Sequence, residues 1–98
     1  MTWLWTWGGR SFGYREEDEL FTHDGQHIGH FIEEEVYGPD GAYLGEVHQE
    51  RLIRNKSKAA KRSPSWAPSA SRAAIVNYVG YVGYVMIAGY EDFPKLEG

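Results

Sequence analysis

A pattern of sixteen residues recurs along the first half of the chain. Leu20 to Phe31 (LFTHDGQHIGHF) is one copy, and Val36 to Val47 (VYGPDGAYLGEV) follows at an offset of sixteen residues without a gap. The same interval before the first of these gives Leu4 to Arg15, and the same interval after the second opens a fourth copy at Leu52. A fixed period indicates that one supersecondary unit is repeated. The repeat therefore constrains the architecture far more than it constrains the function.

Each copy has the chemistry of a short β-hairpin. It opens with two apolar residues, passes through a tight turn and leaves through an apolar residue followed by glycine. In the turn Pro39-Asp40-Gly41, proline and aspartate suit the two central positions, and glycine can take the left-handed conformation that closes a three-residue loop. A second glycine inside each returning strand indicates a bulge or the close approach of another backbone. These glycines are Gly13, Gly29 and Gly45.

A single hairpin is marginally stable, so the copies must share a core. The first apolar position of each copy is expected to form one ring of that core, and the position before the second glycine is expected to form another. The first ring is Leu4, Leu20, Val36 and Leu52, and the second is Phe12, Ile28 and Leu44. An aromatic content of 15% and 12 glycines in 98 residues are also typical of an all-β domain.

The fourth copy departs from the pattern. After Ile53 the turn position has no glycine, and a stretch rich in Lys, Arg, Ser, Ala and Pro follows. The VGYV motifs that begin at Val79 and Val82 match the returning strand, so we expect that strand to resume near Tyr78. The expected organisation is one domain of residues 1–98, with hairpin repeats at about 4–19, 20–35, 36–51 and 52–90 and a long basic insertion at 54–74. This predicts an all-β, pseudo-four-fold small barrel.

The run aromatic-x-x-Asp-Gly-x-x-Ile/Leu-Gly occurs twice, at Phe21–Gly29 and Tyr37–Gly45. It resembles the four-fold β-flower family, small bacterial all-β domains with no assigned activity. The resemblance covers roughly residues 4–85 and implies a fold but no catalytic residues. The missing turn glycine near Ser57 departs from the family pattern. The segment Val36–Val47 is also similar to strands of PRC-barrel domains, which stays open as the alternative.

Charge divides the chain into an acidic body and a basic insertion. The net charge is −4, all 14 acidic residues lie outside residues 51–90, and 7 of the 10 basic residues lie within 51–72. Clustered cations can neutralise phosphates, and a tryptophan among them could stack on a base. The candidate anion-binding residues are Arg54, Lys56, Lys58, Lys61, Arg62 and Trp66. The competing interpretation is a loop that pairs with the acidic rim of its own or a neighbouring subunit.

The residue types that carry catalysis or bind metals are scattered. The chain has no cysteine, and most of its serines lie in the insertion, where nothing nearby in the sequence activates them. His27 and His30 would point to opposite faces of a regular strand and so would not share a metal. The acidic runs 16–19 and 33–35 are expected to form a solvated rim at one end of the domain. We therefore expect no enzymatic activity, no cofactor and no metal.

The uncharged run from Ala73 to Tyr90 is rich in valine and tyrosine. These residues favour a strand, which we expect to be buried, over a membrane helix. Trp3, Trp5 and Trp7 share one face of an extended strand and are expected in the core. The sequence thus predicts a cytoplasmic, non-catalytic binding or assembly module that self-associates as a homo-oligomer through its apolar C-terminal strand. Weak binding of nucleic acid or another polyanion through 54–72 is the alternative, and a small-molecule site where the hairpins converge is a third.

Overall fold

The computed structural model describes residues 1–74 and 80–94, and these residues form an all-β fold. A single turn of 3-10 helix, η1 (Lys56–Lys58), follows the seventh strand. The strands are β1 (Thr2–Thr6), β2 (Ser11–Glu16), β3 (Glu19–Thr22), β4 (His27–Ile32), β5 (Glu35–Tyr37), β6 (Tyr43–His48), β7 (Arg51–Asn55) and β8 (Tyr90–Asp92).

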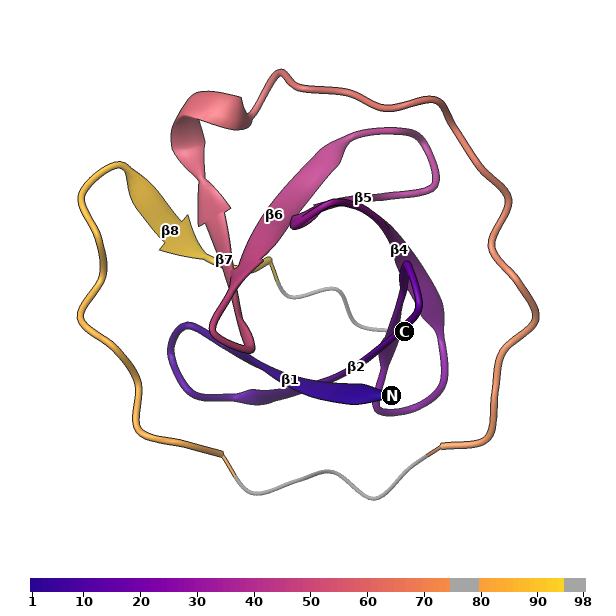
Figure 1. Ribbon diagram of the computed structural model, residues 1–98, viewed down its shortest axis with the longest axis horizontal. Coiled ribbons are helices and arrows are strands. Elements are labelled where there is room, and N and C mark those ends of the chain that lie inside the picture. Colours follow the sequence, from indigo (N-terminus) through magenta and orange to yellow (C-terminus); the bar gives the residue numbers. More distant parts are fainter. Residues whose placement is uncertain (75–79, 95–98) are drawn as a thin grey trace.

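The first seven strands close into a barrel (Figure 1). Each is antiparallel to the strand before it, and a parallel pairing of β1 with β7, through Trp5–Arg51 and Thr6–Leu52, joins the two ends of the sheet. β8 pairs antiparallel with β7 beside this closure. Closure gives partners to strand edges that an open sheet would leave exposed.

The first three hairpins agree with the sequence pattern in detail. The strand register shifts at Leu4/Trp5, Leu20/Phe21 and Val36/Tyr37, which are equivalent places in successive copies. The turn glycines Gly9, Gly25 and Gly41 have φ values of 95°, 91° and 86°, so the predicted left-handed turn position is confirmed. The close approach at Gly13 is also confirmed, because a Cβ there would lie 1.9 Å from the carbonyl oxygen of Phe21.

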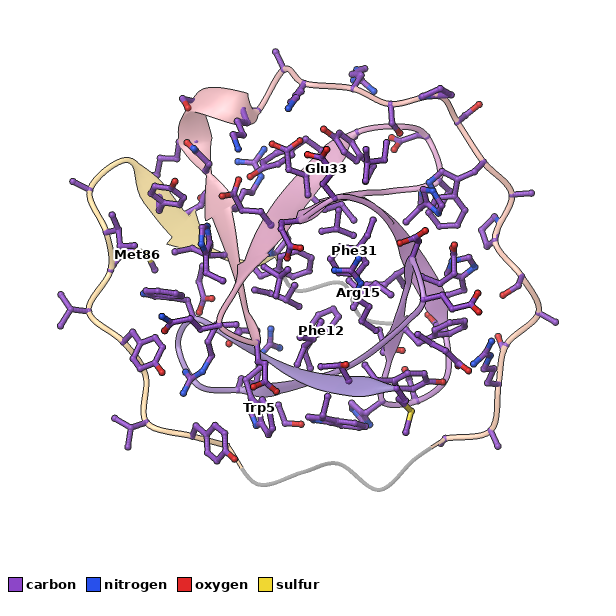
Figure 2. The ribbon with its side chains drawn as sticks, in the orientation of Figure 1. Trp5, Phe12, Arg15, Phe31, Glu33 and Met86 are labelled. Carbon is purple, nitrogen blue, oxygen red and sulfur yellow. The ribbon has the colours of Figure 1, made fainter. Side chains whose placement is uncertain are left out.

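Side chains fill the interior of the barrel. The predicted first ring is confirmed, since its four members lie in one cluster and are at most 2% exposed. Phe12 of the second ring is buried with them, while Ile28 and Leu44 are partly buried and pack against the cluster. Phe12 and Phe31 point into the barrel (Figure 2). A filled interior makes the barrel a packed core rather than a channel.

The region predicted as the fourth hairpin differs from the prediction. β7 pairs with β8, and residues 56–89 connect these two strands, so the connection is longer than the expected insertion at 54–74. Tyr78 and Val79, where we expected the strand to resume, lie outside the described residues. The reason is packing: Phe93, directly after β8, is 3% exposed and meets Phe12 edge-on at 5.2 Å. Phe93 thus supplies an aromatic side chain to the core from beyond the VGY repeats.

In its described residues, the apolar run is also not the buried strand that its composition suggested. Residues 80–87 carry no strand, and their large apolar side chains are exposed. A strand keeps every second residue on one face, whereas tyrosine recurs at every third position in VGYVGY. Three residues per turn is the repeat of a polyproline II helix, in which the backbone forms no internal hydrogen bonds. The prediction of a strand from valine and tyrosine composition was therefore wrong for residues 80–87.

Candidate functional site

The long connection lies on the outside of the barrel (Figure 1), and we call its described parts, residues 59–74 and 80–88, the belt. Its backbone N–H groups bond to the barrel at three-residue intervals. Ser63, Arg72 and Tyr81 donate to the carbonyls of the turn glycines Gly41, Gly25 and Gly9, each at 2.8 Å. Trp66 and Tyr84 donate to the carbonyls of Pro39 and Trp7, each at 3.0 Å. The belt therefore advances nine residues per hairpin and meets the hairpins in reverse order.

Glycine in the belt permits this contact. A Cβ at Gly80 would lie 2.7 Å from the carbonyl oxygen of Gly9, and one at Gly83 would lie 2.7 Å from that of Gly8. Both distances are shorter than a Cβ tolerates, so the V-G-Y triplets suit close apposition of two backbones. The close approach predicted for the second glycine of each hairpin thus also occurs at Gly80 and Gly83, which the sequence pattern placed in a returning strand.

An aromatic layer fills the space between the barrel and the belt. Trp5 stacks on Tyr81 with ring centroids 4.4 Å apart, and Trp7 meets Tyr84 edge-on at 4.9 Å. The indole Nε1 of Trp7 also donates to the carbonyl of Val85 at 3.0 Å. Trp3, Trp5 and Trp7 are at most 9% exposed, so their placement in the core is confirmed. Trp5 points outward from the barrel, opposite to Phe12 (Figure 2).

Two of the candidate anion-binding residues meet carboxylates of the barrel. Lys58 Nζ bonds to Glu35 at 2.7 Å and to Glu46 at 2.9 Å, and Lys61 Nζ bonds to Glu35 at 2.7 Å. The Tyr43 hydroxyl donates to Glu46 at 2.9 Å. Lys58 and then Lys61 lower the pKa of Glu35 to about 2. Burial opposes ionisation of Glu46, but hydrogen bonds led by that from Lys58 outweigh it and lower its pKa.

The other candidates are placed differently. Arg54 pairs with Glu91 on β8. Lys56 and Arg62 are exposed, and within the described residues neither forms an ion pair. Trp66 is half-buried, and its ring lies 4.6 Å from that of His27, so one face of the indole already has a partner. Only part of the basic stretch is thus available to a polyanion.

The Glu35 cluster makes stability depend on acid pH. The folded pKa of about 2 lies below the ordinary value of 4.5, so the stabilisation is full above pH 4.5 and is lost as pH falls toward 2. We expect Glu35→Gln to lower the unfolding free energy by about 1–2 kcal/mol at pH 6, because the lysine partners are partly solvated, and by less near pH 2. Urea unfolding at both pH values measures this. Glu34→Gln is the control, because the Glu34 side chain is 71% exposed, and it should keep the wild-type dependence of the unfolding free energy on pH. If Glu35→Gln lost the same unfolding free energy at both pH values, the Glu35 cluster would not be the source of that pH dependence.

Two histidines converge where the strand pattern predicted that they would diverge. His27 Nε2 lies 2.6 Å from Glu19 Oε1, and His30 Nδ1 lies 2.8 Å from Glu19 Oε2. The expectation that the two histidines lie on opposite faces of β4 was wrong, because the Glu19 side chain on β3 contacts both imidazole rings. A belt serine, Ser69, contacts His27 from the other side. Within residues 1–74 and 80–94, no three His, Asp or Glu side chains are grouped to hold a metal ion.

The outer side of the belt is apolar between Tyr81 and Ile87. Val82 and Val85, each one position after an inward-facing tyrosine, are 84% and 92% exposed. Met86 and Ile87 are 42% and 44% exposed. No residue from Ala73 to Tyr90 is charged. This sector (residues 81–87) contrasts with the first part of the belt, whose exposed residues include the cations Lys61, Arg62 and Arg72.

The third interpretation, a small-molecule site, concerns the end of the barrel where the hairpins are connected. Arg15 spans this end (Figure 2). It donates to the carbonyls of Glu17 at 2.9 Å and Glu33 at 3.4 Å, which belong to two different connections. A cavity of about 410 Å³ lies beside it, with Leu4 and Val47 among its lining residues. The barrel interior beyond the cavity is filled, so any ligand would be confined to this shallow mouth.

Among the residues that the structure describes, no helix has the length and apolarity needed to cross a membrane. Comparisons of the chain with known protein families, with curated proteins and with solved structures found no match.

Proposed function

We propose that this chain is a non-catalytic assembly module that self-associates through the apolar sector 81–87 of its belt. The single observation that supports this most is the exposure of Val82 and Val85 on an uncharged extended segment. Contiguous apolar surface of this kind is typical of protein–protein interaction sites.

A second copy of the chain is the partner that the chemistry favours. The backbone N–H groups of Val82, Val85 and Met86 make no hydrogen bond within the described residues, so they are available to a partner. The net charge of −4 makes two copies of the chain repel each other overall, whereas the sector itself carries no charge. Two-fold pairing of identical segments would bury the valines of both copies and satisfy backbone groups of both.

The test is the oligomeric state of a charged double variant. Val82→Asp with Val85→Asp should convert the oligomer to a monomer, because pairing would bury four unpartnered carboxylates. Native mass spectrometry and light scattering over a concentration series would measure the change. Ala67→Asp with Ala70→Asp is the matched control, since these exposed residues also follow inward-facing ones in the same belt. A monomeric wild type at high concentration, or an unchanged oligomer in the valine variant, would overturn the proposal.

Binding of nucleic acid or another polyanion is the second candidate. It is supported by Lys56 and Arg62, which are exposed and form no ion pair within the described residues. The pairing of Lys58, Lys61 and Arg54 with carboxylates reduces the charge available for it. The same native mass spectra separate the candidates: co-purified mass that disappears in Lys56→Glu with Arg62→Glu would favour polyanion binding.

At the level of the fold, we propose that the hairpins form a pseudo-four-fold arrangement similar to the β-flower family. The support is the equivalence of the three register shifts and three turn glycines, together with a fourth left-handed glycine, Gly89 (φ 85°), before β8. In this proposal, the fourth hairpin is a copy whose turn carries the belt as its insertion. As part of the same proposal, this protein is bacterial and cytoplasmic.

A further inference from the structure

We propose that Ser69 is a reactive nucleophile activated by His27 and Glu19, a function beyond assembly. Ser69 Oγ lies 3.1 Å from His27 Nδ1, and His27 Nε2 lies 2.6 Å from Glu19 Oε1. A hydroxyl within hydrogen-bond reach of an imidazole that a carboxylate orients is the arrangement that activates serine nucleophiles. The three groups come from the belt, β4 and β3, so only the docked belt assembles them.

The hydrogen bonds set His27 in the form that acts as a base. The backbone N–H of Ser69 donates to His27 Nδ1 at 2.9 Å, so Nδ1 carries its lone pair on the side of Ser69, and the hydroxyl at 3.1 Å shares that lone pair with the N–H. The proton of the neutral ring then lies on Nε2, where Glu19 accepts it. His30 contacts the second oxygen of Glu19 at 2.8 Å and helps to hold that carboxylate in place.

Packing holds the imidazole rigidly while the serine stays accessible. The His27 side chain is 5% exposed and lies between two rings, Phe21 at 4.9 Å and Trp66 at 4.6 Å. Ser69 itself is exposed, although its Oγ faces His27. A fixed base beside an accessible hydroxyl satisfies the positional requirement for general-base catalysis.

The geometry also limits the substrate class. The Ser69 backbone N–H is committed to His27, so it is not free to stabilise a developing oxyanion. Reaction is therefore expected with electrophiles that carry a good leaving group, namely activated esters and phosphonyl fluorides. With a phosphonyl fluoride, Ser69 Oγ attacks phosphorus and a P–O bond forms as the P–F bond breaks. Fluoride leaves, and the serine proton passes to His27 Nδ1 and from there to solvent.

The test is phosphonylation of the intact protein by an alkyl fluorophosphonate at pH 8, with the labelled residues located by peptide mass spectrometry. Ser65 and Ser71 are internal controls, since both are exposed on the same belt. A general base contributes about 10²-fold or more, so Ser69 should be labelled about 100-fold faster than either control. Equal labelling of the three serines, or no labelling of Ser69, would overturn the proposal.

Variants and pH distinguish activation from simple accessibility. Ser69→Ala should abolish the label, and His27→Gln should slow it about 100-fold while Ser65 and Ser71 react as before. Because a His27 variant could loosen the belt, the wild-type pH profile is the second measurement. A base must be unprotonated to accept the serine proton, so labelling of Ser69 should fall as the pH is lowered from 8 to 5. Glu19 is the charged group in contact with His27, and His30 contacts the other oxygen of Glu19. A pH-independent rate would refute activation by His27 even if Ser69 were labelled.

Discussion

Replacing Phe93 with alanine should lower the free energy of unfolding by about 3–5 kcal/mol, the usual range for truncating a buried aromatic side chain. The Phe93 ring belongs to the same buried cluster as Leu4 and Leu52. It also covers Gly45, where an added Cβ would lie 2.7 Å from the ring. β8 has three residues and pairs with β7, so Phe93 is its main attachment to the core. Urea unfolding followed by circular dichroism measures the loss.

Ile32→Ala is the control for this change. Ile32 ends β4 and is 45% exposed, so truncating it should alter the unfolding free energy by less than about 1 kcal/mol. A loss for Phe93→Ala as small as that of the control would mean that Phe93 is not part of the core. The returning strand of the fourth hairpin would then have to lie elsewhere in the chain.

Gly9→Ala should be the most damaging substitution at a turn. Gly9 has a φ of 95°, which costs an alanine roughly 1–3 kcal/mol. Its new Cβ would also lie 2.0 Å from the carbonyl oxygen of Tyr81, so the belt would have to move away from Trp5 and Trp7. We expect a total loss of about 2–4 kcal/mol, with faster tryptic cleavage of the belt at Arg72.

Gly89→Ala separates the two causes. Gly89 has nearly the same backbone conformation, with a φ of 85°, but a Cβ there would meet nothing within 4 Å. The Gly89→Ala variant should therefore lose only the part of the unfolding free energy that backbone strain costs, about 1–2 kcal/mol. The rate of tryptic cleavage at Arg72 should stay unchanged. Equal losses for the two variants would show that the belt contributes nothing at Gly9.

Local sequence signals were sufficient to predict the first three hairpins of the barrel. The sixteen-residue period, the turn glycines and the apolar positions such as Leu20 and Val36 predicted three hairpins and the ring that they share. This works because hairpin geometry depends on residues close in sequence, and because the side-chain period of a strand follows directly from its backbone.

The belt and its contacts could not be predicted in the same way. The tyrosine spacing in VGYVGY was available as a sign of three-residue periodicity, but valine and tyrosine composition suggested a strand. Contacts such as those of Lys61 with Glu35, and Ser69 with His27, join residues 26 and 42 positions apart. They exist only because the belt runs past the hairpins in reverse order, and no local pattern specifies that path.

The direction of the belt decides the order in which the molecule can fold. The turn carbonyls that receive belt N–H groups are spread over three hairpins, so the belt has no acceptors until those hairpins exist. The hairpins close short loops, which form readily, whereas the pairing of Asn55 with Tyr90 waits for a much longer stretch of chain to return. The barrel must therefore form before the belt can dock on it. Its circumference sets the number of residues that the connection between β7 and β8 must contain. Shortening that connection by one triplet would displace every later donor from its turn.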